Sequence, residues 1–305
     1  MEALCVSIVW LCKTDLSNMN SGEGGGGNVV ELKTYRAGRR PYMSGQSVRH
    51  ALRAAIERAN PGCFTSTPEA PSCDIAKDWL CDLFGYLSPK KGEGSNRRWS
   101  PIKCTPALGQ VDSEIVTDLL LRMSDLEKSD ENAARDQRLA YVQLTENIYR
   151  VGISIDVFNV GRQLVVEGDS KAKKITRREF QDYIDAKERS RRVQAVIDAV
   201  GRLGDFAKQA RNATSMAPDI FLGAISPVYS QRGLRALELN DNGDVDVDAF
   251  AAIVADLQQA GAELVLGHTP GVVGNDAALL QACKSAGIEV GYPTAMLKKL
   301  AEKVQ

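Results

Sequence analysis

The chain has 305 residues, of which 25% are charged and 44% belong to the hydrophobic set, and its formal net charge is −1. This composition is typical of a soluble globular protein that can bury a core of normal size. The longest apolar run, residues 3–12, is too short to cross a bilayer and follows no basic segment. We therefore expect a cytoplasmic protein with no membrane partner.

The seven cysteines form no C-x-x-C pair, and their spacing does not fit a structural zinc site. Without a secretory signal, free thiols in a reducing compartment are the expected state. Only His50 and His268 could serve as imidazole ligands or bases, and no nucleophile-elbow motif accompanies them. The sequence predicts no metal site, no cofactor and no catalytic acid–base pair.

The small net charge conceals a strong asymmetry along the chain. Residues 33–58 carry seven basic side chains and one acidic one, and residues 171–178 carry five basic side chains and no acidic one. Residues 236–305 carry ten acidic and four basic side chains. Such a chain can bind a polyanion on one face while its total charge stays near zero, and its acidic patches could meet basic patches of a neighbouring copy.

The first sixty residues predict a strand, a polar loop and a helix. Residues 3–14 are expected to form a buried strand, residues 15–28 a glycine-rich loop, and residues 29–35 a second extended segment. Ser44 is a good helix cap, and Pro61 ends the helix. Apolar residues recur between them at the spacing of a buried helical stripe: Val48, Ala51, Leu52, Ala55, Ile56 and Ala59.

The middle of the chain predicts an insertion followed by a return to regular structure. Within residues 63–140 we expect a short helix over 75–86, a basic irregular segment over 88–105 and partly helical structure over 113–138. Strict alternation predicts a strand over 146–158, a turn at 159–161 and a return strand over 162–166. A basic loop at 171–178 and an amphipathic helix over 186–203 follow.

The last third alternates strands and helices. Strands are expected at 220–225, 234–239, 263–266 and 288–290, and helices at 248–260, 276–286 and from Pro293 onward. This mixture indicates an α/β (α+β) fold with a ferredoxin-like core and insertions.

Two glycine- or aspartate-rich patterns are better explained as loops than as ligand sites. Gly22, Gly24 and Gly27 fit G-x-G-x-x-G, but a strand follows where a dinucleotide site needs a helix. The aspartates of residues 241–248 lack the glycine position and closing glutamate of a calcium loop, so an acidic turn before a capped helix is favoured.

The segment from Ser44 to Arg53 carries the strongest functional signal. A helix start presents free N–H groups and partial positive charge, which suits a phosphate, and Gly45 allows a close backbone approach. Arg49 and Arg53 lie one turn apart on the polar face. A capped surface helix with solvated arginines explains the same residues equally well.

This segment resembles the motif of the CRISPR-associated DevR-like family, the "Cas seven" backbone subunits of type I Cascade (I-B or I-A like). The resemblance lies in the Ser44-Gly45-Gln46 start followed by Arg49-His50 and Arg53, and in Ala210-Arg211-Asn212 before a proline. It implies an RNA-recognition (RRM-type) palm with a finger insertion and a thumb hairpin. Residues 1–62 would form the first half of the palm with its RNA-binding helix, 63–140 the finger region, and 141–305 the second half, including a thumb at about 160–215.

The resemblance also implies a function. The chain would be a non-enzymatic subunit that polymerises along a CRISPR RNA (crRNA) and presents it for pairing with target DNA. Its partners would be crRNA, further copies of itself, and the Cas-five, large and small subunits of the complex. Candidate RNA-binding residues are Lys33, Arg36, Ser44, Gly45, Gln46, Ser47, Arg49, His50, Arg53, Arg162, Gln163, Lys171, Lys173, Lys174, Arg211 and Asn212. Arg97, Arg98 and Trp99 form a candidate DNA-binding patch.

Two other functions remain open at this point. A metal-dependent, RNA-cleaving subunit of the type III kind would need a catalytic aspartate, for which Asp15 in an early loop is the candidate. A stand-alone regulator or protein-interaction module is the other alternative. With 6% aromatic residues, we expect base stacking to be secondary to backbone contacts.

Overall fold

The computed structural model describes residues 4–20, 29–90, 94–122, 138–169, 174–207 and 210–304. The strands are β1 (Cys5–Ser17), β2 (Val29–Val30), β3 (Thr34–Tyr35), β4 (Arg40–Met43), β5 (Tyr86–Lys90), β6 (Gly94–Arg98), β7 (Ile102–Cys104), β8 (Ala107–Gly109), β9 (Val116–Arg122), β10 (Arg138–Asp156), β11 (Arg162–Asp169), β12 (Lys174–Asp182), β13 (Ile220–Ser226), β14 (Glu263–His268) and β15 (Glu289–Gly291). The helices are α1 (Gly45–Ala59), α2 (Trp79–Phe84), α3 (Ala186–Val200), α4 (Val247–Gln259), α5 (Asp276–Ser285) and α6 (Pro293–Glu302), with short 3-10 helices η1 (Val157–Asn159) and η2 (Arg232–Arg235).

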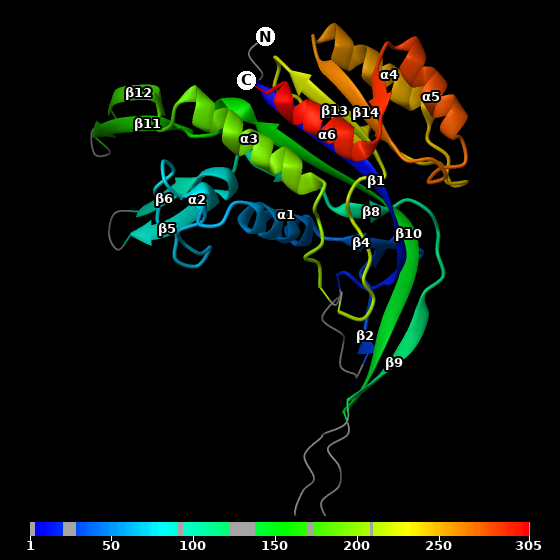
Figure 1. Cartoon of the computed structure of the whole chain (residues 1–305). Coiled ribbons are helices and arrows are strands. Elements are labelled where there is room, and N and C mark those ends of the chain that lie inside the picture. The colour runs from blue at the N-terminus through cyan, green and yellow to red at the C-terminus, as the bar shows by residue number, and fades with distance from the viewer. Residues whose placement is uncertain are drawn as a thin grey trace, which may run out of the picture.

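A single large sheet organises the molecule around β1 and β10. Its strands follow the order β15-β14-β13-β1-β10-β8-β4-β3, and β2, β7 and β9 pair with β10 outside this path. β1 and β10 run antiparallel from the pair Cys5 and Asp156 to the pair Thr14 and Asn147. In Figure 1 they form the long blue and green strands that cross the molecule, and β10 continues beyond the body alongside β9.

The expected mixed α+β fold is confirmed, and the order of elements in this sheet matches a ferredoxin-like unit. In chain order, β1, α1, the short strands β7 and β8, β10, α3 and β13 make a β-α-β-β-α-β unit. β1 pairs antiparallel with both β10 and β13, and β10 pairs antiparallel with β7 and β8. The unit therefore accounts for the central strands, and the remaining elements extend or decorate it.

Two hydrophobic clusters lie on opposite sides of the sheet. β1 separates them because successive strand residues point to opposite faces: Ile8 and Trp10 belong to the first cluster, Val9 and Leu11 to the second. Helices α1, α2, α3 and α6 supply the first cluster, and α4 and α5 supply the second (Figure 1).

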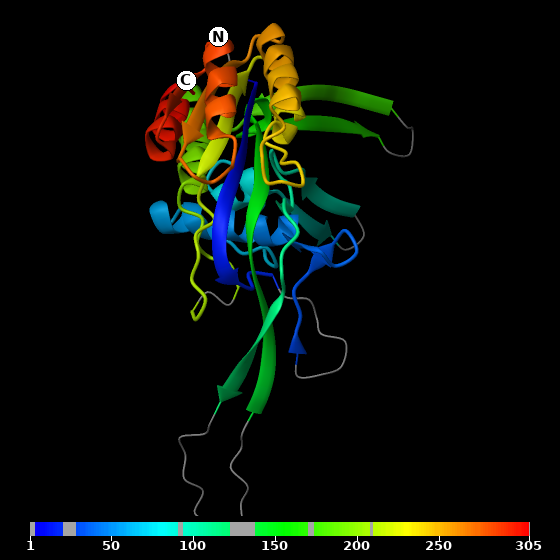
Figure 2. The same ribbon diagram turned by 90° about the vertical axis from the view of Figure 1, so that its right-hand side faces the viewer.

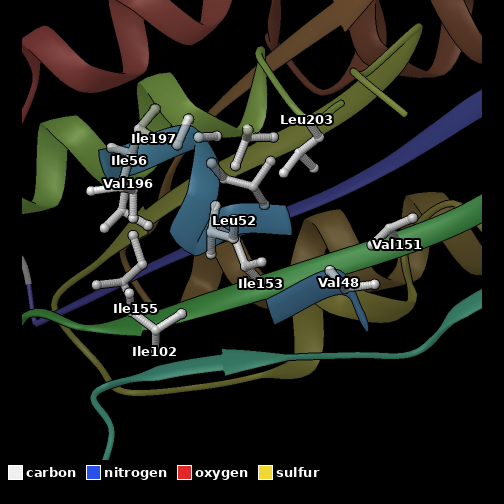
Figure 3. Packing of buried hydrophobic residues seen from close by; sticks show 14 of the residues in the cluster. Val48, Leu52, Ile56, Ile102, Val151, Ile153, Ile155, Val196, Ile197 and Leu203 are labelled. Atoms are coloured by element: carbon white, nitrogen blue, oxygen red, sulfur yellow. The ribbon is translucent and has the colours of Figure 1, made fainter. Parts of the chain in front are cut away.

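The first cluster holds the two helices of the ferredoxin-like unit against β10. Figure 3 shows Leu52 of α1 and Val196 of α3 packed near Ile153 and Ile155 of β10. The helical spacing of the apolar α1 residues and the two-residue spacing in β10 direct both sets toward the same space. Each fully buried aliphatic side chain of this kind stabilises the fold by about 1.5–3 kcal/mol.

The region after β10 differs from the sequence prediction. Residues 162–166 were expected to return along the preceding strand, but β11 pairs with β12 instead, and residues 174–182 form a strand rather than a basic loop. The edges of β10 are already occupied by β1 and by β7 and β8, and η1 turns the chain away from them. The projecting hairpin is therefore separate from the main sheet.

Two further expectations were wrong. Residues 116–122, predicted within a partly helical segment, form strand β9, because Val116 to Arg122 pair in register with β10. The strand predicted over 234–239 is replaced by η2 and an isolated bridge between Leu239 and Val245. In the described ranges, none of the helices has the length and apolar character needed to cross a membrane.

Gly161 forms the turn between η1 and β11, and we expect it to resist substitution. Its φ is +65°, and a Cβ atom at this position would lie 2.1 Å from side-chain carbon atoms of Ile184. Gly161→Ala should lower the free energy of unfolding by about 1–3 kcal/mol through backbone strain alone, and further through the clash, as measured by urea denaturation. Gly38→Ala is the matched control, because Gly38 has φ +85° and no heavy atom within 4 Å of the added Cβ. Equal losses of unfolding free energy in the two variants would show that the Ile184 side chain moves aside without an energetic penalty.

Candidate nucleic-acid interface

A cleft of about 500 Å³ lies between the β6–β7 segment and the β11–β12 hairpin. Both β5–β6 and β11–β12 project from the same side of the molecule in Figures 1 and 2. The cleft therefore joins two groups of residues that the sequence placed in separate regions. Its lining residues are Arg97, Arg98, Trp99, Ser100, Pro101, Lys103, Asp156, Asn159, Arg162, Gln163, Leu164, Val166 and Phe180.

One wall of the cleft presents an exposed aromatic ring and two cations. Trp99 is 76% exposed, and the guanidinium carbon of Arg97 lies 5.5 Å from the centroid of its ring. Lys103 is exposed, and its ammonium donates to the Ser100 carbonyl at 2.7 Å. These side chains provide a flat apolar surface with positive charge at its margin.

The opposite wall is one face of the β11–β12 hairpin. Paired residues of antiparallel strands share a face, so the pairs Leu164 with Phe180 and Arg162 with Asp182 lie on the same side. Phe180 is 52% exposed and packs edge-on against Phe158, with ring centroids 5.0 Å apart. This wall adds a second accessible aromatic ring facing the same space.

Charge in the cleft is predominantly positive. Arg162 donates to Asp182 through Nε at 2.7 Å and Nη2 at 3.1 Å, and its guanidinium carbon lies 4.3 Å from the centroid of the Phe158 ring. The hydrogen bond from Arg162 holds the pKa of the Asp182 carboxyl below its ordinary value, so this pair is ionised at neutral pH. Because Asp182 offsets the charge of Arg162, the exposed cations Arg97 and Lys103 carry most of the attraction for an anion.

The start of α1 has the predicted Ser44 cap, but Gly45 allows close packing within the protein rather than the approach of a ligand. The Ser44 hydroxyl accepts from the Ser47 N–H at 3.3 Å. A Cβ atom on Gly45 would lie 3.3 Å from the Cys104 carbonyl oxygen, so the close backbone approach at Gly45 comes from the β7–β8 connection. Gln46 and His50 are exposed and Ser47 is half-buried, which leaves a polar helix face at the surface.

The two arginines of α1 have different surroundings. Arg49 donates through Nη1 to the Ser100 hydroxyl at 3.0 Å and the Ile102 carbonyl at 3.2 Å, and through Nη2 to the Phe84 carbonyl. Burial lowers the pKa of this guanidinium from its ordinary value. Arg49 thus anchors the segment behind the Trp99 wall. Arg53 is half-buried on the outer face, with Nη2 3.3 Å from Nδ1 of His50.

The other predicted RNA-binding residues are spread over several loops. Lys33 is half-buried, and its carbonyl accepts from the Tyr42 N–H at 2.8 Å; Arg36 is exposed in a tight turn with φ +51°. Exposed Arg211 and half-buried Asn212 lie in the connection between α3 and β13. Gln163 lines the cleft, and Lys174 is exposed at the start of β12. Lys171 and Lys173 lie outside the described residues.

Arg98 and Asp15 occupy positions that the sequence did not indicate. Arg98 is only 7% exposed and donates to protein oxygen atoms beneath the cleft, so its guanidinium is occupied by the protein itself. Asp15 is exposed on β1, which continues to Ser17, rather than in a loop. In the described ranges, no three His, Cys, Asp or Glu side chains are grouped as a metal ion would require.

Sequence reasoning missed Lys103 and Phe180. The apolar residues Leu164, Val166 and Phe180 lie within a segment rich in charged residues, and for Phe180 that contrast was an available signal. Its meaning depends on the pairing of β11 with β12, which brings Leu164 opposite Phe180.

The fold places the chain in a class of mixed α+β proteins built on a ferredoxin-like unit with projecting hairpins. One solved chain from a "CRISPR RNA-guided surveillance complex" is 14% identical, with a TM-score of 0.59 over 98% of both chains. Another, from a "CRISPR RNA-guided surveillance complex, pre-nicking", is 13% identical, with a TM-score of 0.62 over 99% of this chain and 100% of the other. At these identities the likeness shows a shared fold.

The family is shown by the sequence itself. Residues 12–225 match the model of the family described as "CRISPR-associated negative auto-regulator DevR/Csa2", and the chain belongs to this family. The match includes both segments that carried the resemblance, 44–53 and 210–219, so the predicted membership is confirmed. Among curated proteins, none gives a significant match.

Proposed function

We propose that this protein is a non-catalytic subunit of a type I CRISPR RNA-guided surveillance complex and that it binds the guide RNA in the cleft. Its family and its full-length likeness in fold to chains of two such complexes support membership of the complex. The proposal of RNA binding rests on the chemistry of the cleft.

The observation that carries the proposal is the combination of exposed aromatic rings with cations that form no ion pair within the described residues. Grooves that bind single-stranded nucleic acid combine a positive path for the backbone with aromatic rings on which bases stack. Trp99 and Phe180 supply the rings, and Arg97 and Lys103 supply the charge. We thus propose that Arg97 and Trp99, which the sequence suggested as DNA contacts, bind RNA instead. The low aromatic content of the chain predicted a secondary role for base stacking. Because two rings lie in one cleft, we assign base stacking a larger share of the binding free energy.

The same proposal extends to partners and to the division of the chain. Repeated copies would line up along the crRNA, contact the Cas-five, large and small subunits, and leave guide bases free to pair with target DNA. Residues 1–62 and 141–305 would then form the palm and 63–140 the finger region. The β11–β12 hairpin falls within the proposed thumb at about 160–215, and the polar face of α1 would extend the RNA path.

Charge reversal in the cleft tests this function. We expect Arg97→Glu combined with Lys103→Glu to weaken binding of single-stranded RNA for all sequences alike. The slope of log affinity against log salt should become shallower by about 0.7 for each phosphate that the variant no longer neutralises. Fluorescence anisotropy over a salt series measures both quantities.

The matched control places the same charge change on helices that do not line the cleft. Lys284 and Lys298 are exposed on α5 and α6, away from the cleft, and Lys284→Glu combined with Lys298→Glu should leave the slope unchanged. Absence of RNA affinity in the wild-type protein at low salt, or equal losses in both double variants, would contradict the proposal.

A further inference from the structure

A buried ion cluster lies directly beneath the cleft. Asp82 of α2 is fully buried and accepts from Arg98 of β6 and, at 2.7 Å, from Nη1 of Arg192 of α3. Nε of Arg192 also donates to Glu188 at 2.9 Å, so the two buried cations face two carboxylates. The cluster therefore ties three elements of the body together through buried ion pairs.

The same cluster holds the base of the β11–β12 hairpin. Arg98 donates through Nη2 to the Asn159 carbonyl at 2.7 Å and through Nη1 to the Arg162 carbonyl at 2.8 Å. The Gly161 N–H donates back to Asp82 at 2.9 Å. Backbone groups on both sides of the turn are thus fixed to side chains of the opposite wall.

Arg98 has this role because of its place in the sequence. Successive residues of an extended segment point to opposite sides, so Arg97 and Trp99 face the cleft while Arg98 points inward. The residue between the two proposed contact side chains is the one that holds the far wall.

We propose that Arg98 is a positioning residue for nucleic-acid binding, which sets the separation of the cleft walls without touching the RNA. This inference rests on the proposed function of the cleft. A guanidinium is required because its planar fork reaches Asp82 and two separate carbonyls at once, whereas an ammonium on a flexible stem acts as a single point of charge.

The test replaces Arg98 with lysine, which keeps the positive charge beside Asp82 and removes the fork. We expect Arg98→Lys to weaken RNA affinity by about threefold to tenfold, the scale set by losing preorganisation of a few groups. The salt slope should stay at the wild-type value because the same number of phosphates is neutralised. Amide hydrogen exchange should quicken over residues 159–169 and 174–182 in the free protein.

A contact residue should behave differently. Arg97→Gln serves as the comparison and should reduce the salt slope by about 0.7 while leaving hairpin exchange unchanged. If Arg98→Lys reduces the slope in the same way, or changes neither affinity nor exchange, the positioning role is wrong. If the wild-type protein binds RNA in the same assay, such a result contradicts only the positioning role of Arg98. If the wild-type protein does not bind RNA, the proposed function itself is wrong.

A second variant covers the case in which Arg98→Lys does not fold. Arg189 holds the hairpin from the surface, since its Nε donates to the Val160 carbonyl at 2.8 Å and its Nη2 to Asp182. Arg189→Gln leaves the buried cluster intact and should also quicken hairpin exchange and weaken RNA affinity at constant slope. Unchanged affinity with quickened exchange would overturn the inference, because hairpin position would then not matter for binding.

Discussion

Asp82→Asn is expected to lower the free energy of unfolding by about 3–5 kcal/mol, the usual cost of removing one partner from a buried ion pair. Asp82 is fully buried and is the carboxylate that Arg98 and Arg192 share. Asparagine keeps the shape of the side chain but removes its charge and turns one acceptor into a donor facing arginine N–H groups. Urea denaturation followed by circular dichroism measures the loss.

The control for this substitution is Glu69→Gln, which removes a carboxylate charge from an exposed loop position. Surface changes of this kind usually alter stability by less than about 0.5 kcal/mol. A loss for Asp82→Asn no larger than that of the control would mean that the buried arginines are stabilised by their carbonyl partners alone.

Trp99→Ala is expected to weaken binding of single-stranded RNA by about 1–3 kcal/mol, the range found for removing one stacked base contact. In affinity this is about fivefold to 150-fold. The salt slope should not change, because the indole contacts no phosphate in the proposed arrangement. Filter binding or anisotropy at several salt concentrations gives both values.

Tyr292→Ala provides a control of the same kind, because Tyr292 is 77% exposed, close to the 76% of Trp99, but precedes α6 outside the cleft. It should leave RNA affinity at the wild-type value. Matching losses in the two variants would place RNA binding elsewhere on the surface.

Local pattern was enough to predict most of the ferredoxin-like unit. The apolar run at the start, the helical stripe beginning after Ser44 and the amphipathic helix before Gly201 all correspond to observed elements. Each of these has one buried face, and the period of its apolar residues is fixed by its backbone geometry. Secondary structure of this kind needs no knowledge of distant partners.

The hydrogen-bond partners of the arginines could not be predicted from local sequence pattern. Arg98 looks like a surface cation in the sequence, yet its partners lie 16, 61 and 64 residues away. Arg49 likewise bonds to groups 35, 51 and 53 residues away. A charged residue has the same local pattern whether it is solvated or buried in a network, so only the tertiary pairing separates the two cases.

The topology leaves β1 without a partner strand until late in synthesis. β1 lies between β10 and β13, and Cys5 is paired with both Asp156 and Ser226. More than a hundred residues separate the end of β1 from the start of β10. At synthesis rates of about 5–20 residues per second, the ribosome takes on the order of ten seconds after β1 to reach β10, its first partner strand. The strand that becomes the centre of the sheet is thus an apolar segment that a nascent chain must keep from aggregating before its partner strands exist.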